Sequence, residues 1–231
     1  MPQRFADDEW LDAPVTDGVS PLTVVDLDGP GAERFGGRPA ATAKRVFVAL
    51  GGRGTALRDA LDVAIDDDED GQIALMLMAD TCSIAPQAAA VAAQLMRTAD
   101  TGTLAEAFWR ESVTYSMLLA GPEFRDWRRR HRRRKRSSEE PDDDFPIEVD
   151  DQGDVVEIVL NRPHVHNAYS AAMRDALVAI LRLLHRAKDR PMVRLRGNGR
   201  SFCSGGDLDE FGTTPGVVDA HAIRTARAPG L

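Results

Sequence analysis

The sequence predicts an α/β protein built from two parts. Short apolar runs bounded by glycine turns alternate with longer segments whose apolar residues recur at helical spacing, as in a mixed fold. A charged and polar stretch from 128 to 150 interrupts this pattern and cannot bury apolar surface. We therefore expect an N-terminal extension over 1–127 that is α/β or mostly helical, a charged linker over 128–150 and a second domain over 151–231.

The composition fits a soluble globular protein, with 43% hydrophobic and 29% charged residues. No apolar run approaches the roughly 20 residues that span a bilayer, and the acidic N-terminus lacks the order of a signal peptide. Two cysteines, Cys82 and Cys203, give no disulfide framework. We therefore expect a cytoplasmic protein that does not bind membranes.

In the extension, apolar runs and helical periodicity define five elements. These are strands over 22–27 and 45–50, and helices over 55–65, 86–97 and 104–119. The apolar run 73–78 fits either a strand or the start of a buried helix. Thr103 and Glu106 have the spacing of a capping box at the start of the last helix.

The second part begins with an alternating strand over 155–160. Ser170 is a candidate N-cap for a helix that runs to about Arg186, and a further strand covers 192–195. Together these elements predict a domain that begins in a ββα-like manner.

Three local patterns suggest binding sites, but each has a simpler interpretation. The glycines of 51–54 lack the spacing of a dinucleotide or phosphate loop, which favours a plain turn. The acidic segment 66–71 opens like a calcium loop, but Leu77 stands where a bidentate Glu is required, so we expect no metal site. The arginine-rich run 128–136 favours a solvated linker over a nucleic-acid patch, because an acidic run follows it and the net charge is −8.

The most informative segment is Ser201-Phe202-Cys203-Ser204-Gly205-Gly206-Asp207-Leu208. It follows a strand and a glycine-bearing turn, and we expect a helix-like segment after it. Glycine has no Cβ to shield the backbone, and the first N–H groups of a helix have no internal partners. The segment therefore predicts exposed amides that can stabilise a negatively charged oxygen.

Two motifs upstream complete a pattern that resembles a known family. They are Val155-Val156-Glu157-Ile158-Val159-Leu160-Asn161-Arg162-Pro163 and His166-Asn167-Ala168, about 40 residues before the glycine pair. In this order and at this spacing, the motifs resemble the first half of the crotonase (enoyl-CoA hydratase/isomerase) superfamily. The segment Glu111–Phe124 also looks like part of the longer crotonase-like proteins that carry a helical extension.

The resemblance implies a set of site residues. The backbone N–H of Ser204 would form one half of an oxyanion hole for a thioester carbonyl, and Gly205 would allow close approach. Residues near coenzyme A would be Arg162, His166, Asn167, Ala168, Gly206 and Asp207. No separate cofactor is implied, because acyl-CoA is the substrate.

The implied reaction is addition of water to an enoyl thioester, or a double-bond shift in it. Hydratases, isomerases and hydrolases of the family share the glycine string, so the reaction and the acyl group stay open. The family's acid/base carboxylates sit in the second half of the domain, which the resemblance places beyond this sequence. The alternative is therefore a truncated, non-catalytic homologue that acts as a CoA-binding or interaction module. We expect a homo-oligomer or a partner chain that carries the missing half.

Overall fold

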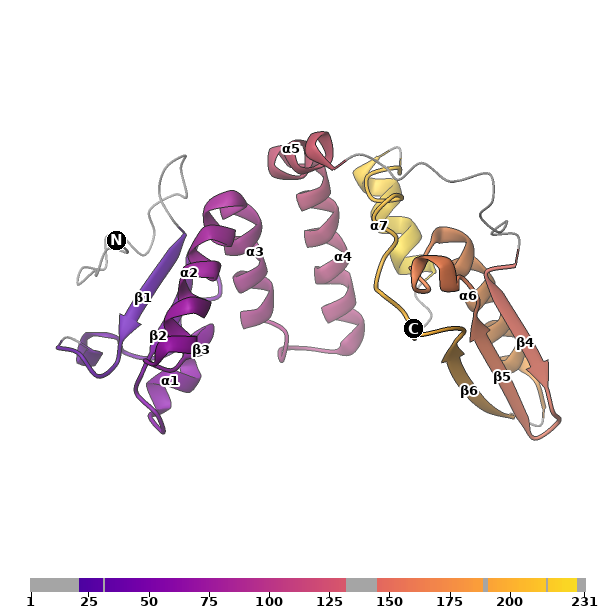
Figure 1. Ribbon diagram of the computed structural model, residues 1–231, viewed down its shortest axis with the longest axis horizontal. Coiled ribbons are helices and arrows are strands. Elements are labelled where there is room, and N and C mark those ends of the chain that lie inside the picture. The colour runs from indigo at the N-terminus through magenta and orange to yellow at the C-terminus, as the bar shows by residue number, and fades with distance from the viewer. Residues whose placement is uncertain (1–20, 31, 132–144, 189–190, 215, 228–231) are drawn as a thin grey trace. The chain divides into compact units, whose positions relative to one another are not determined.

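The computed structural model describes residues 21–30, 32–131, 145–188, 191–214 and 216–227 (Figure 1). The chain divides into two compact units, Met1–Asp126 and Trp127–Leu231. Most of the predicted linker, residues 132–144, lies outside the described residues.

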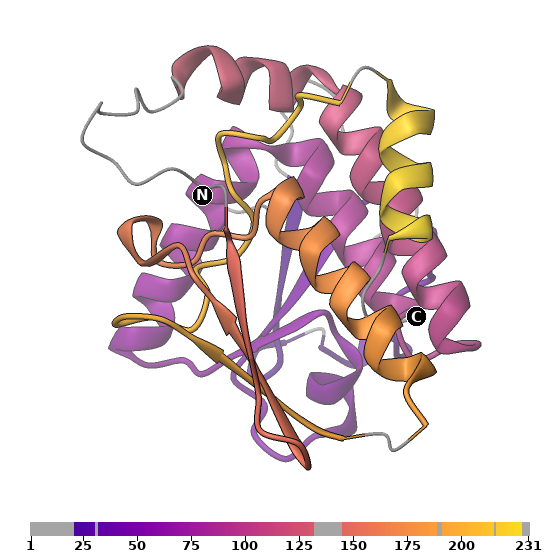
Figure 2. The ribbon, with the colours of Figure 1, turned by 90° about the vertical axis from the view of Figure 1, so that its right-hand side faces the viewer.

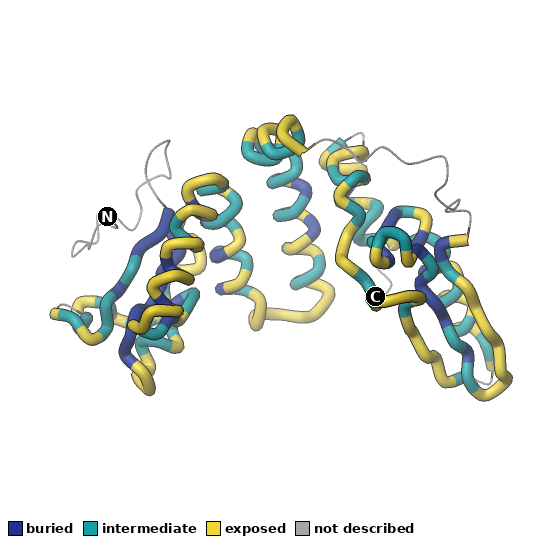
Figure 3. Tube along the Cα trace, viewed as in Figure 1, coloured by how far each residue is buried: buried dark blue, intermediate teal, exposed yellow. Residues whose placement is uncertain are grey.

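The first unit is built on a small parallel sheet with strand order β1-β2-β3. The strands are β1 (Leu22–Asp26), β2 (Val46–Leu50) and β3 (Val63–Ile65). Every residue of β2 is buried, as the dark blue of this strand in Figure 3 shows. A fully apolar central strand of this kind is typical of a parallel sheet covered on both faces.

Helices follow the strands in the first unit, and a short 3-10 helix, η2 (Ala32–Arg34), connects β1 to β2. The α-helices are α1 (Ala56–Ala60), α2 (Glu69–Ile84), α3 (Pro86–Arg97) and α4 (Leu104–Ala120), and α5 (Pro122–Arg130) crosses the boundary between the two units. The predicted helix over 86–97 is confirmed, and the apolar run 73–78 lies inside α2. Thr103 and Glu106 form the expected capping box at the start of α4.

The prediction of one helix over 55–65 is wrong. The helix stops at Ala60, and Val63–Ile65 forms β3, which pairs with β2 in parallel. Asp62 helps to turn the chain, because its carboxylate accepts a hydrogen bond of 2.8 Å from the backbone N–H of Phe47 on β2. Pairing with β2 buries Ile65, and removing this apolar side chain from water stabilises the strand.

The second unit contains a three-stranded sheet, order β4-β5-β6, in which β4 is antiparallel and β6 parallel to β5. The strands are β4 (Ile147–Asp151), β5 (Val155–Leu160) and β6 (Met192–Gly197), and the helices are η3 (Pro163–Val165), α6 (Ala171–Arg186) and α7 (Val217–Ala226). β4 begins inside the segment predicted to be linker. Its alternation of Ile147 and Val149 with acidic residues is a short strand signal that the neighbouring charge run obscured.

Helix α6 packs on one face of this sheet and forms the core of the second unit (Figure 2). Ile158 of β5 and Met173 of α6 are fully buried, and Leu177 packs in the same cluster as Ile158. The predicted cap of α6 is confirmed, because the Ser170 side chain accepts a hydrogen bond from Met173 N–H. This packing fixes the start of α6, beside which the glycine motif lies.

No single helix in the described ranges is long and apolar enough to cross a bilayer. Helices α2 and α3 reach that length and apolar composition only together, and they meet at a bend of 111°.

Candidate functional site

Two loops leave the same edge of the second sheet. β5 and β6 are parallel, and Leu160 pairs with Gly197 in register. The loop after β5 (161–169) and the loop after β6 (198–207) therefore start side by side, as loops at the carboxyl ends of parallel strands do. The backbone N–H of Asn198 donates to Leu160 O at 2.8 Å and extends the pairing into the loops.

Asn167 joins the two loops from the inside. Its side chain is fully buried and makes three hydrogen bonds to backbone groups. The Oδ1 atom accepts from Arg162 N–H at 2.8 Å, and Nδ2 donates to Asn198 O at 2.9 Å and to Ser201 O at 2.8 Å. Its φ of 53° lies in the left-handed region, which asparagine tolerates better than most residues. A single buried amide therefore fixes the relative position of both loops.

A buried ion pair ties the same two loops together. Arg162 Nη1 lies 2.9 Å from Asp207 Oδ2 and donates to Ala168 O at 2.6 Å. The Arg162 and Asp207 side chains are only 6% and 15% exposed, so solvent screens this pair little. The Arg162 guanidinium thus holds the segment that follows the glycine pair.

The glycine turn is further held by the residues that start α6. Tyr169 N–H donates to Gly205 O at 2.8 Å, and Asp207 N–H donates to Tyr169 O at 3.1 Å. Burial raises the pKa of the Tyr169 phenol. The Glu210 carboxylate accepts from Ala171 N–H at 2.6 Å and so caps α6, where a negative charge is favourable.

The turn leaves backbone donors open. Within the described parts of the chain, no acceptor hydrogen-bonds the backbone N–H of Ser204 or of Gly206. Gly205 has φ of 96°, and a Cβ added there would meet nothing within 4 Å. The Ser204 hydroxyl is turned toward Val165 O at 3.5 Å, a long contact. Exposed amides therefore line an open surface.

The expected helix directly after the glycines is absent from the structure of residues 207–212. These residues form consecutive turns, and α7 begins only at Val217. The Asp207 side chain turns inward to Arg162. The open amides thus come from the glycine turn and not from the start of a helix.

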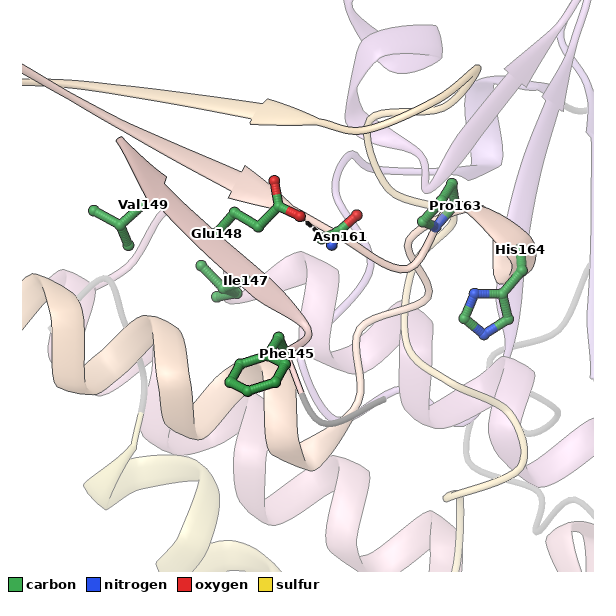
Figure 4. Close-up of a pocket in the computed structure, with 7 residues that line it drawn as sticks. All are labelled: Phe145, Ile147, Glu148, Val149, Asn161, Pro163 and His164. Carbon is green, nitrogen blue, oxygen red and sulfur yellow. Dashed lines mark hydrogen bonds between the residues drawn. The ribbon is translucent and has the colours of Figure 1, made fainter. Parts of the chain in front are cut away.

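A separate pocket of 590 Å³ lies beside the outer strand of the sheet (Figure 4). It is lined by Phe145, Ile147, Glu148, Val149, Asn161, Pro163 and His164. A hydrogen bond of 2.5 Å from Asn161 Nδ2 to Glu148 Oε1 crosses its wall. None of these lining residues belongs to the glycine turn.

Known proteins resemble the region that contains these two loops. The family model for enoyl-CoA hydratase/isomerase matches residues 155–216. A curated protein from Rhodobacter capsulatus, described as a probable enoyl-CoA hydratase, is 50% identical to this chain over 75 residues. Residues 155–216 are therefore similar to the enoyl-CoA hydratase/isomerase family.

The match covers 32% of this chain and 28% of the Rhodobacter relative, so the chain spans less than a third of that protein's length. Among solved structures, an enoyl-CoA hydratase from Mycobacterium tuberculosis H37Rv is 38% identical, with a TM-score of 0.28, over 29% of this chain and 30% of that one. One from Mycobacterium marinum is 29% identical, with a TM-score of 0.29, over 33% of this chain and 42% of that one.

The motifs that resemble the crotonase superfamily meet at one place in the structure. Arg162, Asn167, Ala168, Gly205, Gly206 and Asp207 all take part in the interlocked loops described above. His166 lies on their rim, exposed and with φ of 53°, and its Nδ1 is 3.4 Å from Ser201 Oγ. Contact of these residues with coenzyme A stays a prediction.

Two residues that hold the glycine turn in place were missed by sequence reasoning. The positioning roles of Tyr169 and Glu210 carry no sequence signal. Tyr169 acts through its backbone, and Glu210 caps a helix that begins 39 residues earlier in the chain. Within the described residues, no group of three or more His, Cys, Asp or Glu side chains could hold a metal ion.

Proposed function

We propose that the glycine turn binds the thioester carbonyl oxygen of an acyl-CoA, and that Ser204 N–H donates a hydrogen bond to it. As an enolate forms, negative charge moves onto this oxygen, and a fixed donor stabilises that charge more than it stabilises the substrate. The observation that carries the proposal is the open Ser204 amide in a turn whose neighbours are held by hydrogen bonds.

The surrounding loops support the proposal because they are rigid before any ligand arrives. Asn167 and the Arg162–Asp207 pair connect the loops through buried contacts, and Tyr169 holds the glycine turn on both sides. A donor that is already in place costs no reorganisation when charge develops.

The reaction proposed for this site is hydration of an enoyl thioester, or a shift of its double bond, through an enolate. By the family resemblance, the carboxylates that transfer protons lie in a later part of the domain than residues 155–216. We therefore propose that this region supplies one oxyanion amide and that proton transfer needs groups outside it.

The test compares two substitutions at Ser204 in binding of crotonyl-CoA, measured by calorimetry. Ser204→Ala keeps the N–H, so we expect affinity close to that of the parent chain. Ser204→Pro removes the donor, so we expect the affinity to fall about tenfold. This is the loss expected when one hydrogen bond to a polarised oxygen is removed.

Both variants are first compared by circular dichroism and urea unfolding, so that a folding defect is recognised. In an assembled form that turns over crotonyl-CoA, Ser204→Pro should lower the rate by about 10²–10³-fold. If Ser204→Ala were as damaging as Ser204→Pro with folding intact, the hydroxyl would be the working group and the proposal would be wrong.

A further inference from the structure

The sheet of the second unit has an open edge on each side. β4 and β6 are its outer strands, and no other strand in the described parts of the chain pairs with either of them on the outer side (Figure 1). Residues 148–151 of β4 and 192–196 of β6 are all exposed (Figure 3). An open edge presents backbone N–H and C=O groups to which a further strand can add.

On the face of the sheet that packs against α6, both edges are apolar. Val149 of β4 and Leu195 of β6 are each in register with Ile158 of β5, which lies in the core with Leu177 of α6. Ile158 is fully buried, whereas Val149 is 49% and Leu195 42% exposed. Helix α6 thus covers the centre of the sheet and leaves apolar side chains uncovered at both edges, where an added strand would bury them.

On the opposite face, the β4 edge is acidic. Among the described residues, the Glu148 carboxylate is bonded to the neutral Asn161 amide at 2.5 Å, and the Asp150 carboxylate to the neutral Gln152 amide at 2.8 Å. Because these partners carry no charge, the β4 edge keeps both negative charges.

On that same face, the β6 edge is basic. Arg194 and Arg196 both pair with Glu157 of β5, at 3.7 Å and 2.7 Å. Two guanidinium groups thus share one carboxylate, and the edge keeps a net positive charge. Arg194 is the more weakly held of the two, and its side chain is 62% exposed.

We propose that β4 of one copy of this chain pairs with β6 of a second copy. Within one copy, β4 is antiparallel and β6 parallel to β5, so β4 and β6 run in opposite directions. A second copy placed beside the first in the same orientation therefore brings its β4 antiparallel to β6. The joined sheet then has α6 of both copies on the same face.

One register of this pairing matches both faces of the sheet. It places three pairs of residues opposite each other: Val149 and Leu195, Asp150 and Arg194, and Glu148 and Arg196. The first pair is apolar and lies on the face of α6, and the other two join opposite charges on the other face. Directly opposed apolar pairs and pairs of opposite charge both stabilise an antiparallel sheet.

The pocket beside β4 offers space for the side chains of the added strand (Figure 4). Glu148 and Val149 line this pocket, and the register places Arg196 and Leu195 of the second copy against them. The pocket is also lined by Phe145, which is 78% exposed. An incoming arginine can therefore lay its aliphatic stem along apolar side chains while its guanidinium reaches a carboxylate.

Pairing of identical edges fits less well. β4 against β4 would bring acidic residues together, and β6 against β6 would bring arginines together, and like charges directly opposite each other are destabilising. The complementary pairing is head-to-tail, so each copy keeps one edge for a further copy. We therefore expect assemblies larger than dimers, whose size grows with concentration.

The test reverses one charge at each edge of the full chain and measures association by sedimentation velocity over a range of concentrations. Asp150→Arg and Arg194→Glu should each weaken self-association at least about tenfold, because like charges then face each other across the interface. An equimolar mixture of the two variants should recover the association of the parent chain, since the two reversed residues then face each other with opposite charge.

The matched controls are Asp67→Arg and Lys188→Glu, which make the same charge changes at exposed positions outside β4 and β6. Alone or mixed, they should associate like the parent chain. Circular dichroism and urea unfolding of each variant identify any folding defect. Equal weakening by the controls would show a general effect of net charge and overturn the interface.

Three further results would overturn the pairing of β4 with β6. They are a parent chain that stays monomeric at every concentration, a mixture of folded variants that does not recover association, and stronger association of Asp150→Arg alone. The last result would indicate a symmetric dimer through β4, in which removing the acidic charge relieves repulsion. None of the paired residues belongs to the glycine turn, so each result is independent of the proposed function.

Discussion

The glycine turn after β2 and the glycine turn after β6 both follow a parallel strand, but their amides are used differently. In the first unit, Gly51 N–H donates to Ile65 O and Gly52 N–H to Asp28 Oδ2, each at 3.0 Å. In the second unit, the described residues provide no acceptor for the N–H of Ser204. The first turn (51–54) is therefore closed by hydrogen bonds to its neighbours, whereas the second turn (203–207) is open at Ser204.

The carboxylates around the two turns explain the difference. In the first turn, the Asp28 carboxylate accepts from Gly52 N–H, while Asp66 pairs with Arg53 of the turn at 2.7 Å and with Arg58 of α1 at 2.9 Å. In the second turn, the carboxylate of Asp207 points to the buried Arg162, and within the described residues the N–H groups of Ser204 and Gly206 stay uncovered. A glycine turn therefore becomes a candidate anion site only when nearby carboxylates are held away from its donors.

The largest expected effect is on the ion pair beneath the open turn. Arg162→Met leaves the Asp207 carboxylate without its partner, which should lower the free energy of unfolding by about 3–5 kcal/mol. Arg58→Met, on α1 beside the closed turn, should lower the free energy of unfolding by only about 1–2 kcal/mol, because Asp66 keeps its ion pair with Arg53. Urea unfolding followed by circular dichroism measures both.

The double variant Arg162→Met/Asp207→Leu should recover much of the loss, because no buried charge is left unpaired. Equal losses for the Arg162 and Arg58 variants would contradict the view that the open turn is the more rigidly supported one.

Asn167→Ala should cause the next largest loss in the free energy of unfolding. It leaves Arg162 N–H, Asn198 O and Ser201 O without their buried partner, at a cost of about 2–3 kcal/mol. The comparison in the closed turn is Thr55→Ala, which removes the cap of α1 and should cost about 1 kcal/mol. If thermal or urea unfolding ranked the two in the opposite order, Asn167 would not be the connection between the loops.

Alanine in place of glycine separates crowding from backbone strain. Gly51 has φ of 70°, and an added Cβ would lie 2.1 Å from Asp28 Oδ2. Gly205 also has a positive φ, but its Cβ would meet open space. We expect a loss of about 2 kcal/mol for Gly51→Ala and about 1 kcal/mol for Gly205→Ala. A greater loss at Gly205 would show that the open turn is more tightly packed than the structure indicates.

The smallest effect concerns pH. The hydrogen bond from Arg53, followed by the charges of Arg53 and Arg58, holds the pKa of Asp66 below its usual value near 4. A carboxyl with a lowered pKa stabilises the fold above its usual pKa, and this stabilisation is lost as the pH falls through the lowered pKa. Asp66→Asn should therefore flatten the acid side of the stability curve slightly, while Asp67→Asn serves as the exposed control.

The sequence predicted most elements whose signal is local. The helix over 104–119, its Thr103 cap and the helix that begins after Ser170 all follow from spacing and capping residues. The end of α1 was missed, because pairing of Val63–Ile65 with β2 depends on a strand that is distant in the sequence.

The site was predictable only in part for the same reason. The motif predicted an open amide at Ser204, but the residues that hold the turn act across separations of 31 to 45 positions, as in the bonds from Asn167 to Asn198 and from Arg162 to Asp207. Periodicity and local spacing carry no information on such contacts.

The central claim is that the Ser204 amide is an open donor that receives the thioester oxygen. The most direct measurement is the ¹⁵N–¹H spectrum of the full chain during titration with crotonyl-pantetheine. The Ser204 N–H should move downfield and exchange more slowly with solvent, while Gly52 N–H, already bonded to Asp28, should not change. Saturable binding that leaves the Ser204 resonance in place would contradict the claim.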